Sequence, residues 1–165
     1  MSILKIETGE DNPILRQKST KVDKIDKSTK KFAKDLLKTM IKANGLGIAA
    51  PQVGINKRLF ITTLNEDTDH ATAILMINPE IFWRSDETNI AEEGCLSLPK
   101  IFKPVPRSTK IKVKFLDLKG NEHLLELEGL NARVVQHEND HLDGILFTDI
   151  AVDGKADDPS THVAF

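Results

Sequence analysis

The sequence is nearly free of cysteine, since Cys95 is the one thiol in 165 residues. A single cysteine cannot form an intramolecular disulfide, which fits a reducing compartment and leaves the thiol available for other chemistry. The chain also lacks a basic excess, because 23 Lys and Arg oppose 25 Asp and Glu for a net charge of −2. This balance argues against a dedicated nucleic-acid binder, so we expect no direct nucleic-acid binding.

Long apolar segments are missing as well. The start of the chain has no apolar core of a signal peptide, and no run approaches the roughly 20 apolar residues that span a bilayer. There is no internal repeat and no low-complexity tract. Hydrophobic residues make up 39% of the chain and charged residues 29%, which is typical of a globular protein. We therefore expect one cytoplasmic domain over residues 1–165, without membrane contact.

Two segments have helical periodicity. Apolar residues recur at helical spacing over residues 27–44, with lysines on the other face, which predicts an amphipathic N-terminal helix. Residues 130–142 return to a helical period, and Gly144 is a plausible stop. Residues 151–165 have no period, and we expect this tail to be irregular.

Strand patterns lie between the two helices. Residues 111–115 and 122–129 alternate between apolar and charged side chains on either side of a turn, which predicts an antiparallel hairpin. Shorter apolar runs predict two further strands, at residues 58–64 and 74–77, the second ending at Asn78-Pro79. The fold class is therefore α+β, with antiparallel strands, one early helix and one late helix.

The late helix carries two histidines at helical spacing. His137 and His141 are four residues apart, so their rings leave one helix face with Cβ atoms roughly 5–6 Å apart. Both imidazoles can then reach one metal ion at about 2.0–2.1 Å, the Zn–N distance. Glu138 leans toward the same position, where its carboxylate can take a proton from bound water.

Two histidines need a third ligand to hold a metal. One group of zinc proteases has the pattern H-E-x-x-H-x-x-G-x-x-H, which this chain follows as far as Gly144, but Phe147 stands at the ligand position. No Glu follows Glu138, which argues against the other common endopeptidase pattern. Downstream aspartates and His162 stay open as ligands. Cys95 is the better candidate, because a Cys-His-His set leaves the fourth tetrahedral position open for water, as in catalytic sites.

Three segments together resemble the peptide deformylase family. They are the glycine-rich stretch 45–52, which ends Ala-Ala-Pro-Gln, the run Glu-Gly-Cys-Leu-Ser at 93–97, and Gln-His-Glu-x-x-His at 136–141. Their order and separations also match the family, and the resemblance covers roughly residues 4–147. It implies antiparallel strands packed around a central helix that carries the HExxH motif. It also implies a metal-dependent hydrolase that removes the formyl group from the N-terminal formyl-methionine of newly made polypeptides.

The resemblance further implies a cofactor and catalytic roles. The cofactor is one divalent metal, Fe(II) in the family, with Zn, Ni or Co able to replace it. Its ligands are Cys95, His137 and His141. The metal would lower the pKa of bound water to supply hydroxide, while Glu138 accepts the proton and later delivers it to the departing amine. The expected oxyanion donors are the Gln52 side-chain amide and the Leu96 backbone N–H.

Substrate contacts also follow from the resemblance. In the family, backbone at the positions of Gly47 and Gly94 flanks the peptide, which lies extended like an added strand. Leu46, Val134 and His137 match positions near the apolar pocket for the methionine side chain. As partners that orient the histidines, Asp140 and the backbone both stay open.

The expected partners are N-formylmethionyl nascent peptides near the ribosome, and the protein is expected to be a monomer. Two departures from the family pattern concern these contacts. Phe102 stands where some members carry a basic residue near the peptide's path, and the tail after Phe147 is short and acidic where some members have a basic helix. Two alternatives to a deformylase are another metallopeptidase and a non-catalytic, metal-stabilised module. Glu138 and Gln52 favour catalysis, because a structural metal site needs neither.

Overall fold

Strands are the more abundant regular element of the structure, a computed structural model that describes residues 2–157 and 162–165. The helices are α1 (Lys27–Lys42), α2 (Gly129–Leu142) and α3 (Phe147–Ile150), with a short 3-10 helix at Ala50–Val53. The strands are β1 (Gly47–Ala49), β2 (Leu59–Leu64), β3 (Thr72–Arg84), β4 (Thr88–Cys95), β5 (Leu98–Ser108), β6 (Lys110–Leu116), β7 (Glu122–Glu128) and β8 (His162–Ala164). The predicted α+β class with antiparallel strands is confirmed.

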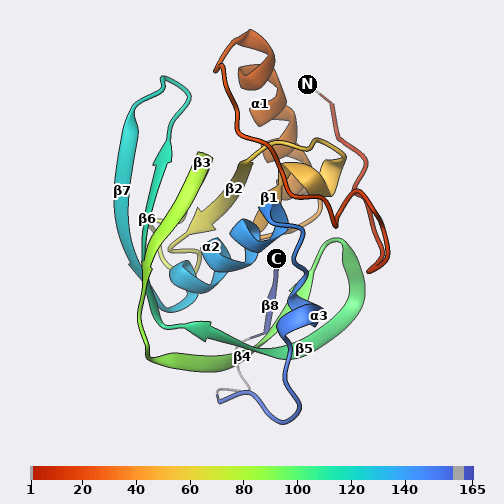
Figure 1. The fold of residues 1–165 in the computed structure, drawn as a ribbon, viewed down its shortest axis with the longest axis vertical. Coiled ribbons are helices and arrows are strands. Elements are labelled where there is room, and N and C mark those ends of the chain that lie inside the picture. The colour runs from red at the N-terminus through yellow and green to blue at the C-terminus, as the bar shows by residue number, and fades with distance from the viewer. Residues whose placement is uncertain (1, 158–161) are drawn as a thin grey trace.

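Within the described residues the strands form two sheets. One has the order β1-β2-β3-β6-β7 with every pair antiparallel, and the other has the order β5-β4-β8, in which β8 runs parallel to β4. Helix α2 contacts strands of both sheets, and Figure 1 shows it crossing the middle of the molecule with strands around it. Side chains of α2 are therefore buried on nearly all sides.

The β6–β7 hairpin follows directly from the alternating pattern. Ile111, Val113 and Phe115 of β6 are buried, and the lysines between them are partly exposed. Each β6 residue pairs with a β7 residue in an unbroken antiparallel register from Lys110 to Leu116. The hairpin prediction is confirmed, because one sheet face covers the core and the other meets water.

Helix α1 lies outside this core, against β1 and β2. Asp26 caps its first turn, since the carboxylate accepts hydrogen bonds from the backbone N–H groups of Ser28 and Thr29. Leu36 and Met40 are buried in a cluster that includes residues of β2, while the lysines face outward. No helix of the described residues, α1 included, is long and apolar enough to cross a membrane.

The strand expected to stop at Asn78-Pro79 continues through both residues, so that boundary was wrong. β3 accommodates the proline through a register shift against β6 between Ile77 and Glu80. Proline has no N–H to donate, and at such a shift the regular ladder does not require one. Asn78 adopts a positive φ of 50°, and its side chain bonds the backbone N and O of Val22 at 2.8 and 3.0 Å. A tertiary contact thus stabilises a strand where the local sequence favours a break.

The prediction of an irregular tail over residues 151–165 is wrong at its end. Residues 151–157 contain no helix or strand, but His162–Ala164 form β8 on the edge of β4, and Phe165 is fully buried. The part of this expectation that falls on residues 158–161 lies outside the described residues. Local periodicity could not show β8, because its hydrogen-bonding partner is far away in the sequence.

Candidate metal centre and active site

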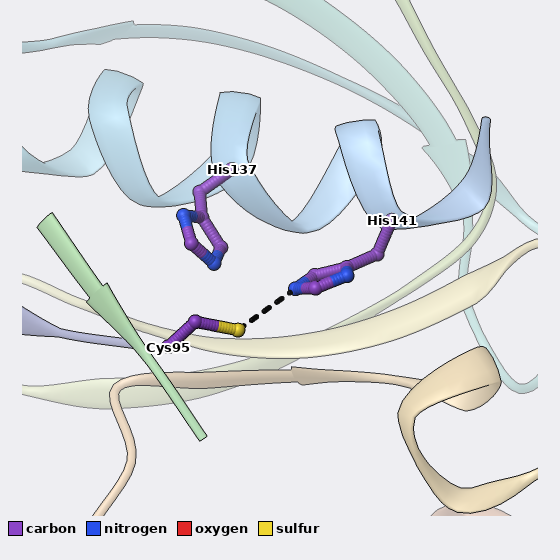
Figure 2. A group of neighbouring side chains, drawn as sticks. All are labelled: Cys95, His137 and His141. Carbon is purple, nitrogen blue, oxygen red and sulfur yellow. Dashed lines mark hydrogen bonds between the residues drawn. The ribbon is translucent and has the colours of Figure 1, made fainter. Parts of the chain in front are cut away.

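Helix α2 and the end of β4 bring three candidate ligands together. His137 and His141 lie one turn apart with ring centroids 5.1 Å from each other, and Cys95 is the last residue of β4. Figure 2 shows both imidazoles directed from the helix toward the thiol. The three ligand atoms lie within 4.8 Å of one another, and Cys95 Sγ is 3.4 Å from His141 Nε2.

This geometry fits a tetrahedral metal ion. Standard Zn–S and Zn–N distances at a tetrahedral angle put sulfur and nitrogen roughly 3.5 Å apart. His137 Nε2 is buried and has no hydrogen-bond partner among the described residues. Burial raises the pKa of the Cys95 thiol to about 12 and lowers the pKa of His141 well below its usual value. A neutral imidazole is the form that binds a metal ion. A bound cation would also offset the free-energy cost of burying a charged thiolate.

Two of the downstream aspartates are engaged elsewhere. Asp143 bonds Arg58 at 2.8 Å, and Asp149 bonds Arg16 at 2.6 Å. The side chain of His162 lies outside the described part of the chain. Within that part, Cys95 is therefore the thiol or acidic group that stands beside both histidines.

Glu93 orients His137, a role that we did not expect. His137 Nδ1 lies 2.8 Å from Glu93 Oε1, and Arg107 and Arg133 also bind this carboxylate, at 2.9 and 2.7 Å. Burial by itself would raise the pKa of Glu93, but the charge of Arg107 and the bond from His137 outweigh it and place the pKa below its ordinary value. The carboxylate is therefore charged and accepts from Nδ1–H, which leaves the Nε2 lone pair for a metal.

Asp140 was one of two open candidates for that orienting role, and it bonds Arg107 instead. The sequence contained a partial signal for this network. Arg133 lies one helical turn before His137, so the two side chains share a face of α2. Glu93 sits two residues before Cys95 in β4, with a register shift between them, and nothing local shows that it meets α2.

Glu138 is fully buried and unpaired. Neither of its carboxylate oxygens has a hydrogen-bond partner among the residues that the structure describes. Burial, and then the charge of Glu93, raise its pKa well above the usual value. The carboxylate fits only because Gly47 has no side chain, since a Cβ at that position would lie 2.7 Å from Glu138 Cδ. A buried carboxylate without a partner is typical of a catalytic group.

Gln52 lies beside the thiol. Its Oε1 accepts a hydrogen bond from the Ala49 backbone N–H at 2.8 Å, which fixes the amide. Its Nε2 then points at Ser97 Oγ, 3.1 Å away, and at Cys95 Sγ, 3.5 Å away. Ser97 is a further residue that sequence reasoning did not single out.

The remaining predicted residues make contacts with the core and with neighbouring segments. The Leu96 backbone N–H donates to the Phe165 carbonyl oxygen at 2.6 Å. Val134 is buried in the central core, and Leu46 packs against the same cluster. The ring of Phe102 lies over Gly94, where a Cβ would be 2.8 Å from Phe102 Cδ1.

A cysteine and two histidines beside an unpaired buried glutamate are typical of metal-dependent hydrolases. Comparison with known proteins identifies the family. The sequence model of the polypeptide deformylase family matches residues 3–157. Peptide deformylase 1 of Clostridium perfringens is 50% identical over 139 residues, which cover 84% of this chain and 92% of that protein.

Solved structures agree. Peptide deformylase from Thermotoga maritima is 42% identical with a TM-score of 0.85, over 91% of this chain and 98% of that one. The Met-Ala-Ser-bound class I type b peptide deformylase from Acinetobacter baumannii is 38% identical with a TM-score of 0.82, over 90% and 98%. The chain therefore belongs to the polypeptide deformylase family. Its activity is peptide deformylation, the hydrolytic removal of the formyl group from N-formylmethionyl peptides.

Proposed function

We propose that this chain deformylates nascent peptides at the centre formed by Cys95, His137, His141 and Glu138. The observation that carries the proposal is the buried pair of Glu138 oxygens, which lack partners among the described residues and belong to the same helix as the two candidate histidine ligands. The scaffold is a set of antiparallel strands around α2, which is the central helix with the HExxH motif, and α1 is the amphipathic outer helix. Deformylation of nascent chains would place the protein in the cytoplasm near the ribosome. We propose that it acts there as a monomer.

Cys95, His137 and His141 would hold one divalent cation. The donor set suits Fe(II) or Zn, and Ni or Co could replace them. When such a cation is bound, the chemistry it supplies is Lewis-acid polarisation and a lower pKa of coordinated water. Glu93 supports this site because it fixes the ring of His137 through Nδ1.

Glu138 moves the proton. Its carboxylate would accept a proton from the water that attacks the formyl carbon, and would then deliver that proton to the departing amine nitrogen. The absence of competing hydrogen bonds within the described residues leaves both oxygens available for this transfer. Gly47 supports the role because its bare backbone admits the carboxylate.

Gln52 and Leu96 would stabilise the oxyanion. The Gln52 amide is fixed by the Ala49 N–H, so its Nε2 donates in a set direction beside the thiol. The Leu96 N–H follows Cys95 directly in the chain and is the second donor. Donors that are already oriented cost no reorganisation when charge develops.

The methionine side chain would enter the apolar region formed by Leu46, Val134 and His137, with the peptide extended beside Gly47 and Gly94. Val134 is buried, and Leu46 packs against the cluster that contains Val134. The Acinetobacter baumannii relative, whose solved structure holds Met-Ala-Ser, supports a peptide of this kind as the occupant.

The test is Glu138→Gln, which keeps the shape of the side chain and removes the base. We expect formate release from formyl-Met-Ala-Ser by Fe(II)-loaded protein, prepared without oxygen, to fall by at least about 10²-fold. Metal content per chain should stay the same, because Glu138 is not a ligand. The matched control is Glu122→Gln, an exposed glutamate at the start of β7, which should leave the rate unchanged. A Glu138→Gln protein with the wild-type rate would remove Glu138 from the mechanism.

A further inference from the structure

The tail of this chain adds a strand at the edge where the substrate peptide is proposed to lie. β8 pairs in parallel with β4, with His162, Val163 and Ala164 opposite Glu92, Glu93 and Gly94. Figure 1 shows β8 beside β4, with the C-terminal end of the chain below α2. The pairing therefore ends at Gly94, the residue that precedes Cys95 in β4.

Phe165 occupies the apolar region beside the candidate metal centre. Its side chain is fully buried, and its ring centroid is 4.5 Å from that of His137. Phe165 belongs to the same buried cluster as Val134, and Leu46 packs against this cluster. These are the residues proposed above to surround the methionine side chain.

The backbone of Phe165 uses the hydrogen-bonding groups of the proposed active site. Its N–H donates to the Gly94 carbonyl oxygen at 3.2 Å, and its carbonyl oxygen accepts from the Leu96 N–H at 2.6 Å. Leu96 N–H is the proposed oxyanion donor, and Gly94 flanks the proposed peptide path. A bound substrate would need both groups.

The segment that makes these contacts lies beyond the family match, which ends at residue 157. The contacts are thus made by residues additional to the matched catalytic core. Peptides bind sheet edges in the same way, because they add an extended strand to the edge and insert apolar side chains into pockets beside it.

We propose that residues 162–165 act as an internal inhibitory strand, with Phe165 seated in the methionine pocket, and that the substrate peptide must displace them. The proposal rests on the active site proposed above. Its consequence is quantitative, because a competitor on the same chain lowers the apparent affinity for substrate by the fraction of molecules in which the pocket is open. The tail competes before the substrate is bound, so the chemical step itself is unaffected.

Phe165→Ala tests the proposal through the split between KM and kcat. We expect KM for formyl-Met-Ala-Ser to fall by about threefold or more, with kcat unchanged. The reason is that a tail without the Phe165 ring competes less well for the methionine pocket. The matched control is Phe82→Ala on β3, an exposed phenylalanine in the other sheet, which should change neither constant. An unchanged or raised KM in Phe165→Ala would overturn the proposal, since Phe165 would then be a permanent part of the core or of the pocket wall.

A second measurement covers the case in which Phe165→Ala fails to fold. In the unaltered, metal-loaded chain, the Phe165 amide should be protected from hydrogen exchange by its bond to Gly94. Saturation with Met-Ala-Ser should remove this protection, and continued protection would overturn the proposal. Failure of the proposed function would look different, because neither the wild type nor Phe165→Ala would then release formate.

Discussion

Among single residues, Gly47 and Glu138 show most directly how the site depends on close approach. The Glu138 carboxylate lies against the Gly47 backbone, in a space that any side chain at residue 47 would fill. Gly47 has no positive φ, so its role comes from this contact and not from a special backbone conformation. The Gly47 backbone and the proposed catalytic carboxylate are therefore fitted to each other.

Gly47→Ala should reduce the rate of deformylation by about 10²-fold, because the new Cβ would displace the Glu138 carboxylate from the reacting atoms. The check is kcat for formyl-Met-Ala-Ser, with metal content measured in parallel. Gly45→Ala is the comparison variant, since its Cβ would be nearest to Leu96 Cδ1, the far end of a side chain that can move, and would stay 3.2 Å from the Gly47 backbone oxygen. Equal losses in the two variants would show that Glu138 does not depend on this contact.

At the scale of elements, α1 depends on its first turn. Asp26 Oδ1 accepts from the backbone N–H groups of Ser28 and Thr29 at 2.9 and 3.0 Å, and also from the Ser28 hydroxyl at 2.7 Å. The bond from the Ser28 hydroxyl and those from the backbone lower the pKa of Asp26 to about 2. The charged carboxylate thus satisfies donors that the helix leaves unpaired.

Asp26→Ala should lower the melting temperature by a few degrees near neutral pH, and the difference from wild type should vanish in acid. A depressed pKa in the folded state stabilises the fold above the unfolded pKa, here 3.8, and this contribution is lost as the pH falls toward 2. Thermal unfolding between pH 7 and pH 2 measures the effect. Asp23→Ala, at an exposed aspartate just before the helix, is the matched control and should leave the melting temperature at pH 7 unchanged. A constant deficit for Asp26→Ala would exclude the charge as its cause.

At the scale of the whole molecule, one buried ion network joins the small sheet to α2. Glu93 of β4 binds Arg107 of β5 and Arg133 of α2, and all three side chains are at most 4% exposed. Arg133 also donates to the Val105 backbone oxygen at 2.8 Å. The network therefore sets how β4, with Cys95 at its end, lies relative to the two histidines.

Glu93→Gln should lower the free energy of unfolding by about 3–5 kcal/mol, because it leaves buried guanidinium groups without their counter-charge. Urea denaturation of the metal-free protein measures this loss without a contribution from metal binding. The control is Glu126→Gln, whose ion pair with Lys112 is exposed and should be worth less than about 1 kcal/mol. Similar losses in the two variants would contradict a structural role for the network.

Local features of the sequence were sufficient to predict structure that depends on residues close together in the chain. The alternation in β6 and β7 predicted their hairpin, because period-2 patterning decides which face of a strand is buried. The spacing of His137 and His141 predicted their proximity, because residues four apart share a helix face. The local prediction that a strand ends at Asn78-Pro79 was wrong, because contacts with Val22 and a register shift keep β3 continuous.

Tertiary structure decided whatever joins residues that are distant in the chain. The sequence offered Cys95 as a candidate ligand, but only the packing of β4 against α2 brings its sulfur to His141. Glu93 meets His137, and β8 places Phe165 beside the same ring, through contacts that no periodicity contains. The sequence by itself thus determined the fold class, the family motifs and the local spacing of the histidines. Three-dimensional packing determined how His137 is oriented and that Phe165 lies beside its ring, because both depend on contacts between distant segments.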